Sequence, residues 1–235
     1  MKYMGSKRRI AKDIVPIMVA ERKPNQYYVE PFCGGCNTLE HVEGNRIGAD
    51  VNYNLIDMWI AVSGGWMPPT HEITESRYNE LKTISKKNDP LNTNPLIGYT
   101  AFALSYGGKF WGGYMRDKAG KRNYSLEAYK NSLIQFPRLQ GVAFVCASYL
   151  ELCIPNPSII YCDPPYAGTT KYTTTFNSVY FWKWCQNQVR NGHTVFVSEY
   201  TCPVPHVVLY EKVQTSSLTK ETGSRIAVEK LFKIL

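Results

Sequence analysis

The feature that most constrains the fold of this chain is the apolar run Ser158–Cys162, which ends at Asp163-Pro164-Pro165-Tyr166. β-Branched and aromatic residues favour a buried strand, and a proline without an N–H ends the hydrogen-bond ladder of that strand. Proline also keeps the residue before it out of helical geometry. We therefore expect a rigid turn at the carboxyl end of a strand, which is where open α/β sheets bind ligands.

The groups on this turn suit a nucleobase that carries an amino group. The Asp163 carboxylate and the Pro164 carbonyl are two acceptors that can bind one NH₂ group. The Tyr166 ring can stack on a flat heterocycle. The alternative interpretation is an ordinary strand end, closed by a proline turn and covered by a packing tyrosine.

A second strand with a glycine loop strengthens the first interpretation. The run Tyr27–Val29 leads into the loop 30–37, which contains Pro31-Phe32-Cys33-Gly34, and glycines after a strand let the backbone approach a ligand closely. The short run Arg46–Asp50 then ends in an acid, which at the tip of a second strand can hold ribose hydroxyls. The chain has no Gly-x-x-x-x-Gly-Lys-Ser/Thr motif for phosphate. The pattern therefore indicates a nucleoside ligand without a pyrophosphate.

With both elements in view, the chain resembles the alpha-group N6-adenine-specific DNA methyltransferases, the class that includes the GATC-methylating enzymes. The resemblance covers nearly the whole chain and rests on motifs in the order of that group. These are Tyr3-Met4-Gly5-Ser6-Lys7 (amino-terminal cofactor motif), Pro31-Phe32-x-Gly34 (glycine-rich loop), Asp50 (ribose acid), Asp163 to Tyr166 (catalytic motif), Phe196 to Tyr200 (a later strand) and Glu229 to Phe232 (the carboxyl-terminal strand).

The resemblance implies an α/β, Rossmann-like S-adenosylmethionine-dependent methyltransferase fold with an inserted, mostly helical target-recognition lobe. It also implies transfer of a methyl group from S-adenosylmethionine to N6 of an adenine flipped out of duplex DNA, without a metal. Asp163, Pro164, Pro165 and Tyr166 would be catalytic. The residues implied to bind the cofactor are Tyr3, Met4, Gly5, Lys7, Pro31, Phe32, Cys33, Gly34, Asp50, Ser148 and Asp163.

Two positions depart from the pattern of the family. Cys36 stands where the loop usually has a glycine, and Ser148 stands where an acid near the cofactor's adenine is usual. Two alternatives therefore stay open: a non-catalytic DNA-binding relative with a decayed cofactor site, and an RNA adenine methyltransferase.

Composition fits a protein that binds a polyanion. The net charge is +8 and the pI is near 9.0, which favours nucleic acid over a membrane as the partner. Seven cysteines without a disulfide framework indicate a reducing cytoplasm, and the resemblance implies a prokaryotic or phage-infected cell. The pair Cys33 and Cys36 has redox spacing, but two small residues in a glycine loop are the favoured interpretation. No obligate protein partner is evident.

The organisation of the chain is discontinuous. We expect a first catalytic part (residues 1–62), a target-recognition insert (63–141) and a second catalytic part (142–235). Helices are predicted at 9–21, 54–62, 75–85, 95–104 and 125–138, and a β-hairpin at 106–125.

The insert carries much of the charge and is the predicted DNA-binding part. Between Ala101 and Gln140 there are seven cations against two acids, with aromatic residues between them. Arginine can bind a guanine edge at two points, and lysine more often contacts phosphate. A solvated basic surface over a small aromatic core is the alternative. The expected DNA-binding residues are Lys109, Trp111, Tyr114, Arg116, Lys118, Lys121 and Arg122, with GATC as the target by analogy.

Overall fold

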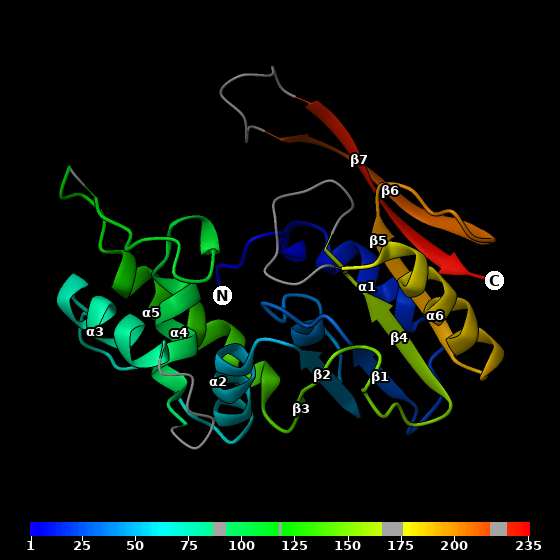
Figure 1. Cartoon of the computed structure of the whole chain (residues 1–235), viewed down its shortest axis with the longest axis horizontal. Coiled ribbons are helices and arrows are strands. Elements are labelled where there is room, and N and C mark those ends of the chain that lie inside the picture. The colour runs from blue at the N-terminus through cyan, green and yellow to red at the C-terminus, as the bar shows by residue number, and fades with distance from the viewer. Residues whose placement is uncertain (87–92, 118, 166–175, 217–224) are drawn as a thin grey trace.

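The computed structural model describes residues 1–86, 93–117, 119–165, 176–216 and 225–235, and Figure 1 shows its elements. The helices are η1 (Lys7–Arg9), α1 (Ala11–Val19), η2 (Leu39–His41), α2 (Tyr53–Ser63), α3 (Glu75–Ser85), α4 (Pro95–Ala103), η3 (Tyr106–Gly108), α5 (Tyr124–Gln135), η4 (Phe136–Leu139) and α6 (Ser178–Arg190), where η marks a short 3₁₀ helix. The strands are β1 (Tyr27–Glu30), β2 (Arg46–Asp50), β3 (Ala143–Cys146), β4 (Ser158–Cys162), β5 (Thr194–Glu199), β6 (His206–Ser216) and β7 (Arg225–Ile234). None of the helices in these ranges is both long and apolar enough to cross a bilayer.

The strands form one sheet in the order β3-β2-β1-β4-β5-β7-β6. The pairs from β3 to β5 are parallel, whereas β7 is antiparallel to both β5 and β6. The direction in which the chain crosses the sheet reverses between β1 and β4. This reversal is the switch point at which doubly wound sheets bind nucleotides, and it confirms the expected Rossmann-like α/β fold.

The central strands are buried on both faces, as their continuous apolar runs predict. Successive residues of β4 alternate between two hydrophobic clusters: Ile159 and Tyr161 pack with helices α1 and α2, whereas Ile160 and Cys162 pack with helix α6. All five residues of β4 are buried.

The helices begin where the sequence supplies capping groups. The side chains of Asn52, Thr74, Asn94, Asn123 and Asn177 accept a backbone N–H in the first turn of α2, α3, α4, α5 and α6. The predicted helices therefore appear within a few residues of their expected bounds. The predicted strands at 158–162 and 46–50 match β4 and β2 at both ends.

The predicted β-hairpin at 106–125 is wrong for the residues that the structure describes there. The segment makes one isolated bridge, Ser105 to Tyr114, and no strand. Gly107, Gly108 and Gly113 all have positive φ, which breaks the extended geometry that a ladder needs. The Trp111 and Tyr114 rings pack on Tyr78 of α3 instead.

Helices α3, α4 and α5, with the segments that join them, form what we call the helical lobe, which lies at one side of the sheet (Figure 1). It is not a separate core, because Tyr99 and Phe102 of α4 belong to the same hydrophobic cluster as Trp59 of α2. The closest approach is at Gly98. A Cβ added there would lie 2.1 Å from the Asn54 carbonyl oxygen and 2.9 Å from the Met58 Cβ.

We expect Gly98→Ala to lower the free energy of unfolding by about 1–3 kcal/mol, because the added methyl group forces α4 away from α2. Helix propensity alone predicts the opposite sign, a gain of about 1 kcal/mol. Urea denaturation of both proteins measures the difference. Gly64→Ala is the matched control, because Gly64 has a φ of −82° at the end of α2 and the nearest atom to its added Cβ is 3.4 Å away. A Gly98→Ala protein as stable as the wild type would contradict the close packing.

Candidate active site

The ends of β2, β1 and β4 bring the sequence-predicted residues to one edge of the sheet. Asp50 ends β2, and its carboxylate accepts the backbone N–H of Gly34 (3.3 Å) in the loop after β1 and of Asn52 (2.9 Å). Asp163 follows β4 directly. Burial raises the pKa of Asp50, and the backbone N–H donors oppose that shift. The acid of the second strand is therefore tied to the glycine loop.

The amino-terminal motif lies against the same loop. The Tyr3 ring is so close to Gly34 and Gly35 that a Cβ on either would come within 2.7 Å of a Tyr3 side-chain atom. The ring also stacks on Phe102 of α4 at a centroid distance of 5.1 Å. The Met4 N–H donates to the Gly108 carbonyl (3.1 Å). The motif thus joins the glycine loop to the helical lobe.

Lys7 lies between two carboxylates rather than out in solvent. Its Nζ is 2.7 Å from Asp163 Oδ1 and 3.0 Å from Glu229 Oε1, and it also donates to the Gly5 carbonyl at 3.3 Å. The Lys7 and Glu229 side chains are 8% and 7% exposed. Burial alone would lower the pKa of Lys7, but Asp163 and then Glu229 raise it above its ordinary value. The lysine expected to hold the cofactor therefore contacts the carboxylate of the catalytic motif.

The rest of the catalytic motif is only partly within the described residues. Pro164 is buried and Pro165 is half-buried at the end of β4, whereas Tyr166 lies outside the described residues. In the glycine loop, Pro31 is buried and the Phe32 ring packs on Tyr149 at a centroid distance of 5.3 Å.

The two loop cysteines are structural. Cys33 and Cys36 are buried free thiols, and burial raises the pKa of each, which disfavours the reactive thiolate. Cys36 has a φ of 53°, in the left-handed region that favours glycine. The backbone of the loop therefore keeps the geometry of the usual glycine, although cysteine occupies the position.

Ser148 has a carboxylate beside it that the motif comparison missed. It follows β3, and its backbone N–H donates to Glu151 Oε2 at 3.3 Å. Ser-x-x-Glu is a capping-box pattern, so this signal was present in the sequence. An acid does stand near this strand end, three residues later than expected.

Three further residues near the site were not predicted: Glu30 and Glu229, which are buried, and Tyr200, which is exposed. Glu229 was noted only as part of a strand. Glu30, at the end of β1, accepts the Tyr28 hydroxyl (3.1 Å), and burial raises its pKa to about 8, so its carboxyl group is largely protonated at neutral pH. Tyr200 follows β5, and its pKa is raised by burial and then by the Glu229 carboxylate. An acid directly after a buried strand, as at Glu30, was the available signal.

In the helical lobe, two of the expected DNA-binding arginines are paired with acids. Arg116 binds both carboxylate oxygens of Glu75, with its Nε 2.7 Å from Oε2. Arg122 binds Glu127 in the same two-point way, at 2.8 Å and 2.7 Å, and lies over the Tyr124 ring. Both guanidinium groups are exposed.

The other expected DNA-binding residues divide into exposed and packed groups. Lys109 and Lys121 are exposed, and Lys118 lies outside the described residues. Trp111 and Tyr114 are half-buried, and the Tyr114 hydroxyl donates to the Ile73 carbonyl at 2.8 Å. Among the described aromatic residues of this segment, Tyr106 and Phe110 are exposed, at 75% and 40%.

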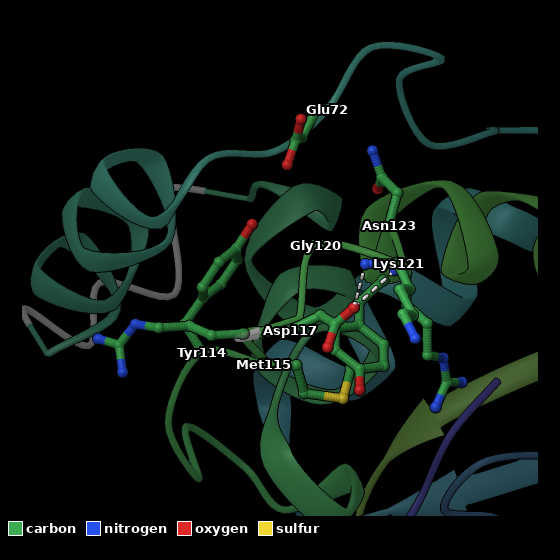
Figure 2. A pocket seen from close by; sticks show the side chains of 10 residues that line it. Glu72, Tyr114, Met115, Asp117, Gly120, Lys121 and Asn123 are labelled. Atoms are coloured by element: carbon green, nitrogen blue, oxygen red, sulfur yellow. Dashed lines mark hydrogen bonds between the residues drawn. The ribbon is translucent and has the colours of Figure 1, made fainter.

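The paired arginines lie on the wall of a hollow of about 460 Å³, which is shown in Figure 2. Asp117 shapes the loop on its wall by accepting the backbone N–H groups of Lys121 (2.6 Å) and Arg122 (2.7 Å). The residues that line the hollow are Glu72, Tyr114, Met115, Arg116, Asp117, Gly120, Lys121, Arg122, Asn123 and Tyr124. This hollow is formed by the helical lobe and contains none of the strand-end residues.

Comparison with known proteins shows what the chain is similar to. Residues 3–101 match the family of D12 class N6 adenine-specific DNA methyltransferases. The chain is 26% identical over 200 residues to a DNA adenine methylase of Vibrio cholerae, covering 75% of this chain and 68% of that protein. It is 26% identical over 188 residues to a DNA adenine methylase of Escherichia coli, covering 71% and 64%. It is 25% identical over 193 residues to the type II methyltransferase M.FokI of Planomicrobium okeanokoites, covering 72% and 29%. These matches confirm the resemblance that the motifs indicate: the chain is similar to the N6 adenine-specific DNA methyltransferases of the D12 class.

Proposed function

We propose that the protein methylates N6 of an adenine that is flipped out of duplex DNA, with S-adenosylmethionine as the methyl donor. The observation that carries this proposal is the position of Asp163. It stands directly after β4 at the switch-point edge and is held by Lys7. Asp50 and the glycine loop lie at the ends of the neighbouring strands β2 and β1. DNA as the substrate agrees with cytoplasmic action, and the likeness to a type II methyltransferase supports restriction and modification as one setting.

The chemistry of the strand-end residues fits S-adenosylmethionine. Asp50 presents a carboxylate where a ribose hydroxyl binds in nucleotide-binding sheets, and the loop holds it there through Gly34. The amino-terminal segment from Tyr3 to Gly5 and the Phe32 backbone would line the rest of the cradle. When bound, the cofactor supplies an electrophilic methyl group on a sulfonium centre.

The residues of the catalytic motif would make the adenine amino group reactive. Its nitrogen is a poor nucleophile because the lone pair is delocalised into the ring. Hydrogen bonds from N6 to the Asp163 carboxylate and the Pro164 carbonyl would favour a tetrahedral nitrogen with its lone pair free to react. Lys7 fixes one oxygen of Asp163, so the carboxylate is oriented before the base arrives. Orientation of this kind supplies much of the rate of a transfer reaction.

The base must first leave the duplex, which costs a few kcal/mol. Tyr166 would stack on the flipped base and offset part of this cost.

In the helical lobe, Arg116 and Arg122 are exposed, and each is held in a fork geometry by its glutamate. Such an arginine could exchange a carboxylate for a guanine edge, which presents a similar pair of acceptors. Lys109, Lys118 and Lys121 would contact phosphates. Together these roles support readout by the lobe, with GATC as the default target.

We expect the purified protein to transfer labelled methyl groups to duplex DNA, and the label to be recovered as N6-methyladenine. Asp163→Ala should lower the rate by about 10²-fold or more, because a group aimed at developing charge is lost. Asp57→Ala is a matched control, since Asp57 lies on α2 outside the strand-end site. Recovery of the label as N4-methylcytosine, on protein, or only on RNA would overturn the proposed function.

Asp50→Ala should weaken S-adenosylmethionine binding by about 1.5–3 kcal/mol, roughly ten- to a hundredfold, because a hydrogen bond to a charged group is lost. Its affinity for DNA alone should not change. Titration calorimetry on the folded protein measures both affinities. Asp50→Asn keeps an acceptor for the Gly34 N–H and controls for disturbance of the loop. Unchanged cofactor affinity in Asp50→Ala would remove this residue from the site.

Arg116→Ala or Arg122→Ala, at least one of the two, should relax the preference between the target and altered sites by about 1–3 kcal/mol. Lys121→Ala should weaken binding to all sequences and reduce the slope of log affinity against log salt by about 1. Glu75→Gln and Glu127→Gln release the arginines from their acids and should tighten DNA binding. Methylation of a randomised duplex library tests the sequence preference. If both arginine variants lose the same activity on every sequence, so that the sequence preference is unchanged, the two arginines contact only phosphates and do not read bases.

A further inference from the structure

Glu229 is a buried acid that the proposed reaction does not yet use. It lies on β7, which pairs with β5 on one side and β6 on the other. Because successive strand residues point to opposite faces, Glu229 shares its face with Leu231 of the core beneath α1. Lys230 points the other way and pairs with Glu211 at 2.8 Å. Glu229 therefore enters the interior, where it meets Lys7.

Lys7 creates an electrostatic difficulty for the proposed chemistry. During transfer the N6 lone pair bonds to the methyl carbon and the carbon–sulfur bond breaks, with its electron pair going to sulfur. Positive charge therefore appears at N6 until an N6 proton leaves to the Asp163 carboxylate and then to solvent. An ammonium group 2.7 Å from that carboxylate opposes this build-up of charge.

Glu229 offsets the positive charge of Lys7, because its carboxylate contacts the same ammonium group. Lys7 and Asp163 together are neutral, whereas Lys7, Asp163 and Glu229 together carry one net negative charge. All three side chains are largely withdrawn from water, so their charges are weakly screened. The lysine can then orient Asp163 without cancelling its charge.

We propose that Glu229 is a positioning residue of the active site, which holds Lys7 and offsets its charge so that Asp163 faces adenine N6 as a net anion. This inference rests on the proposed function. A purely structural role, in which Glu229 only stabilises a buried lysine, predicts a different outcome: a loss of stability without a specific loss of turnover.

The test compares Glu229→Gln, which removes the charge at nearly constant size, with Glu229→Asp, which keeps it. The matched control is Glu211→Gln, which removes the charge of an ion-paired glutamate on the neighbouring strand of the same hairpin. For each folded protein, kcat, the KM for DNA, the KM for S-adenosylmethionine and the melting temperature are measured. A 2-aminopurine at the target position reports base flipping by its fluorescence.

We expect Glu229→Gln to lower kcat by about tenfold or more, with both KM values and the flipping signal little changed, because the loss lies in transition-state charge. Glu229→Asp should recover most of the rate, and Glu211→Gln should match the wild type. A Glu229→Gln protein with wild-type kcat, or a Glu229→Asp protein that is no better than Glu229→Gln, overturns the inference.

A second measurement does not depend on activity. The pKa of Lys7, followed by NMR of isotope-labelled lysine, should be lower in Glu229→Gln than in the wild type, and the same Lys7 pKa in both proteins overturns the proposed coupling. If the wild-type protein methylates no adenine, the proposed function fails while this titration still tests the contact. If the wild type is active and Glu229→Gln equals it, only the role of Glu229 fails.

Discussion

The pairing of β1 with β2 on one side and β4 on the other is the constraint on which the site depends. Both pairs are parallel, so the carboxyl ends of three strands meet at one edge. Each strand end carries a different group: a glycine loop, the acid proposed to bind ribose and the carboxylate proposed to be catalytic. None of the three segments could form the site alone, because each supplies only one side of it. The fold thus converts distant stretches of sequence into one surface.

Buried charge is the second organising feature. A lysine that loses its water is costly to bury unless acids compensate it, and here two carboxylates lie within 3.0 Å of the Lys7 ammonium. The first structural consequence is that the segment before α1 is joined to the end of β4 and to the middle of β7 by charge as well as by apolar packing. The second is that the Asp163 carboxylate, proposed to be catalytic, has a fixed partner before any ligand arrives, so less reorganisation is needed on binding.

Most of the fold could be predicted from local patterns in the sequence. Continuous apolar runs gave β2 and β4, and Asn or Thr caps marked where helices begin. The failures share one cause, which is that the partner of a side chain depends on packing between distant segments. Lys7 sits in a recognisable motif, yet nothing in residues 1–10 points to Glu229. The predicted hairpin is wrong because glycines that favour a turn also favour left-handed backbone, which interrupts a strand. The nearby aromatic ring of Trp111 packs on Tyr78 instead.

The contact of Lys7 with Asp163 and Glu229 also bears on how the protein is made. The three residues come from the start, the middle and the last strand of the described chain, and β7 is inserted between β5 and β6. During synthesis, the lysine and Asp163 emerge long before the strand that compensates their surroundings. Contacts of such high sequence separation require loop closure, which costs entropy before the contact stabilises the fold. A partly synthesised chain that stops before β7 therefore lacks the acid that compensates Lys7.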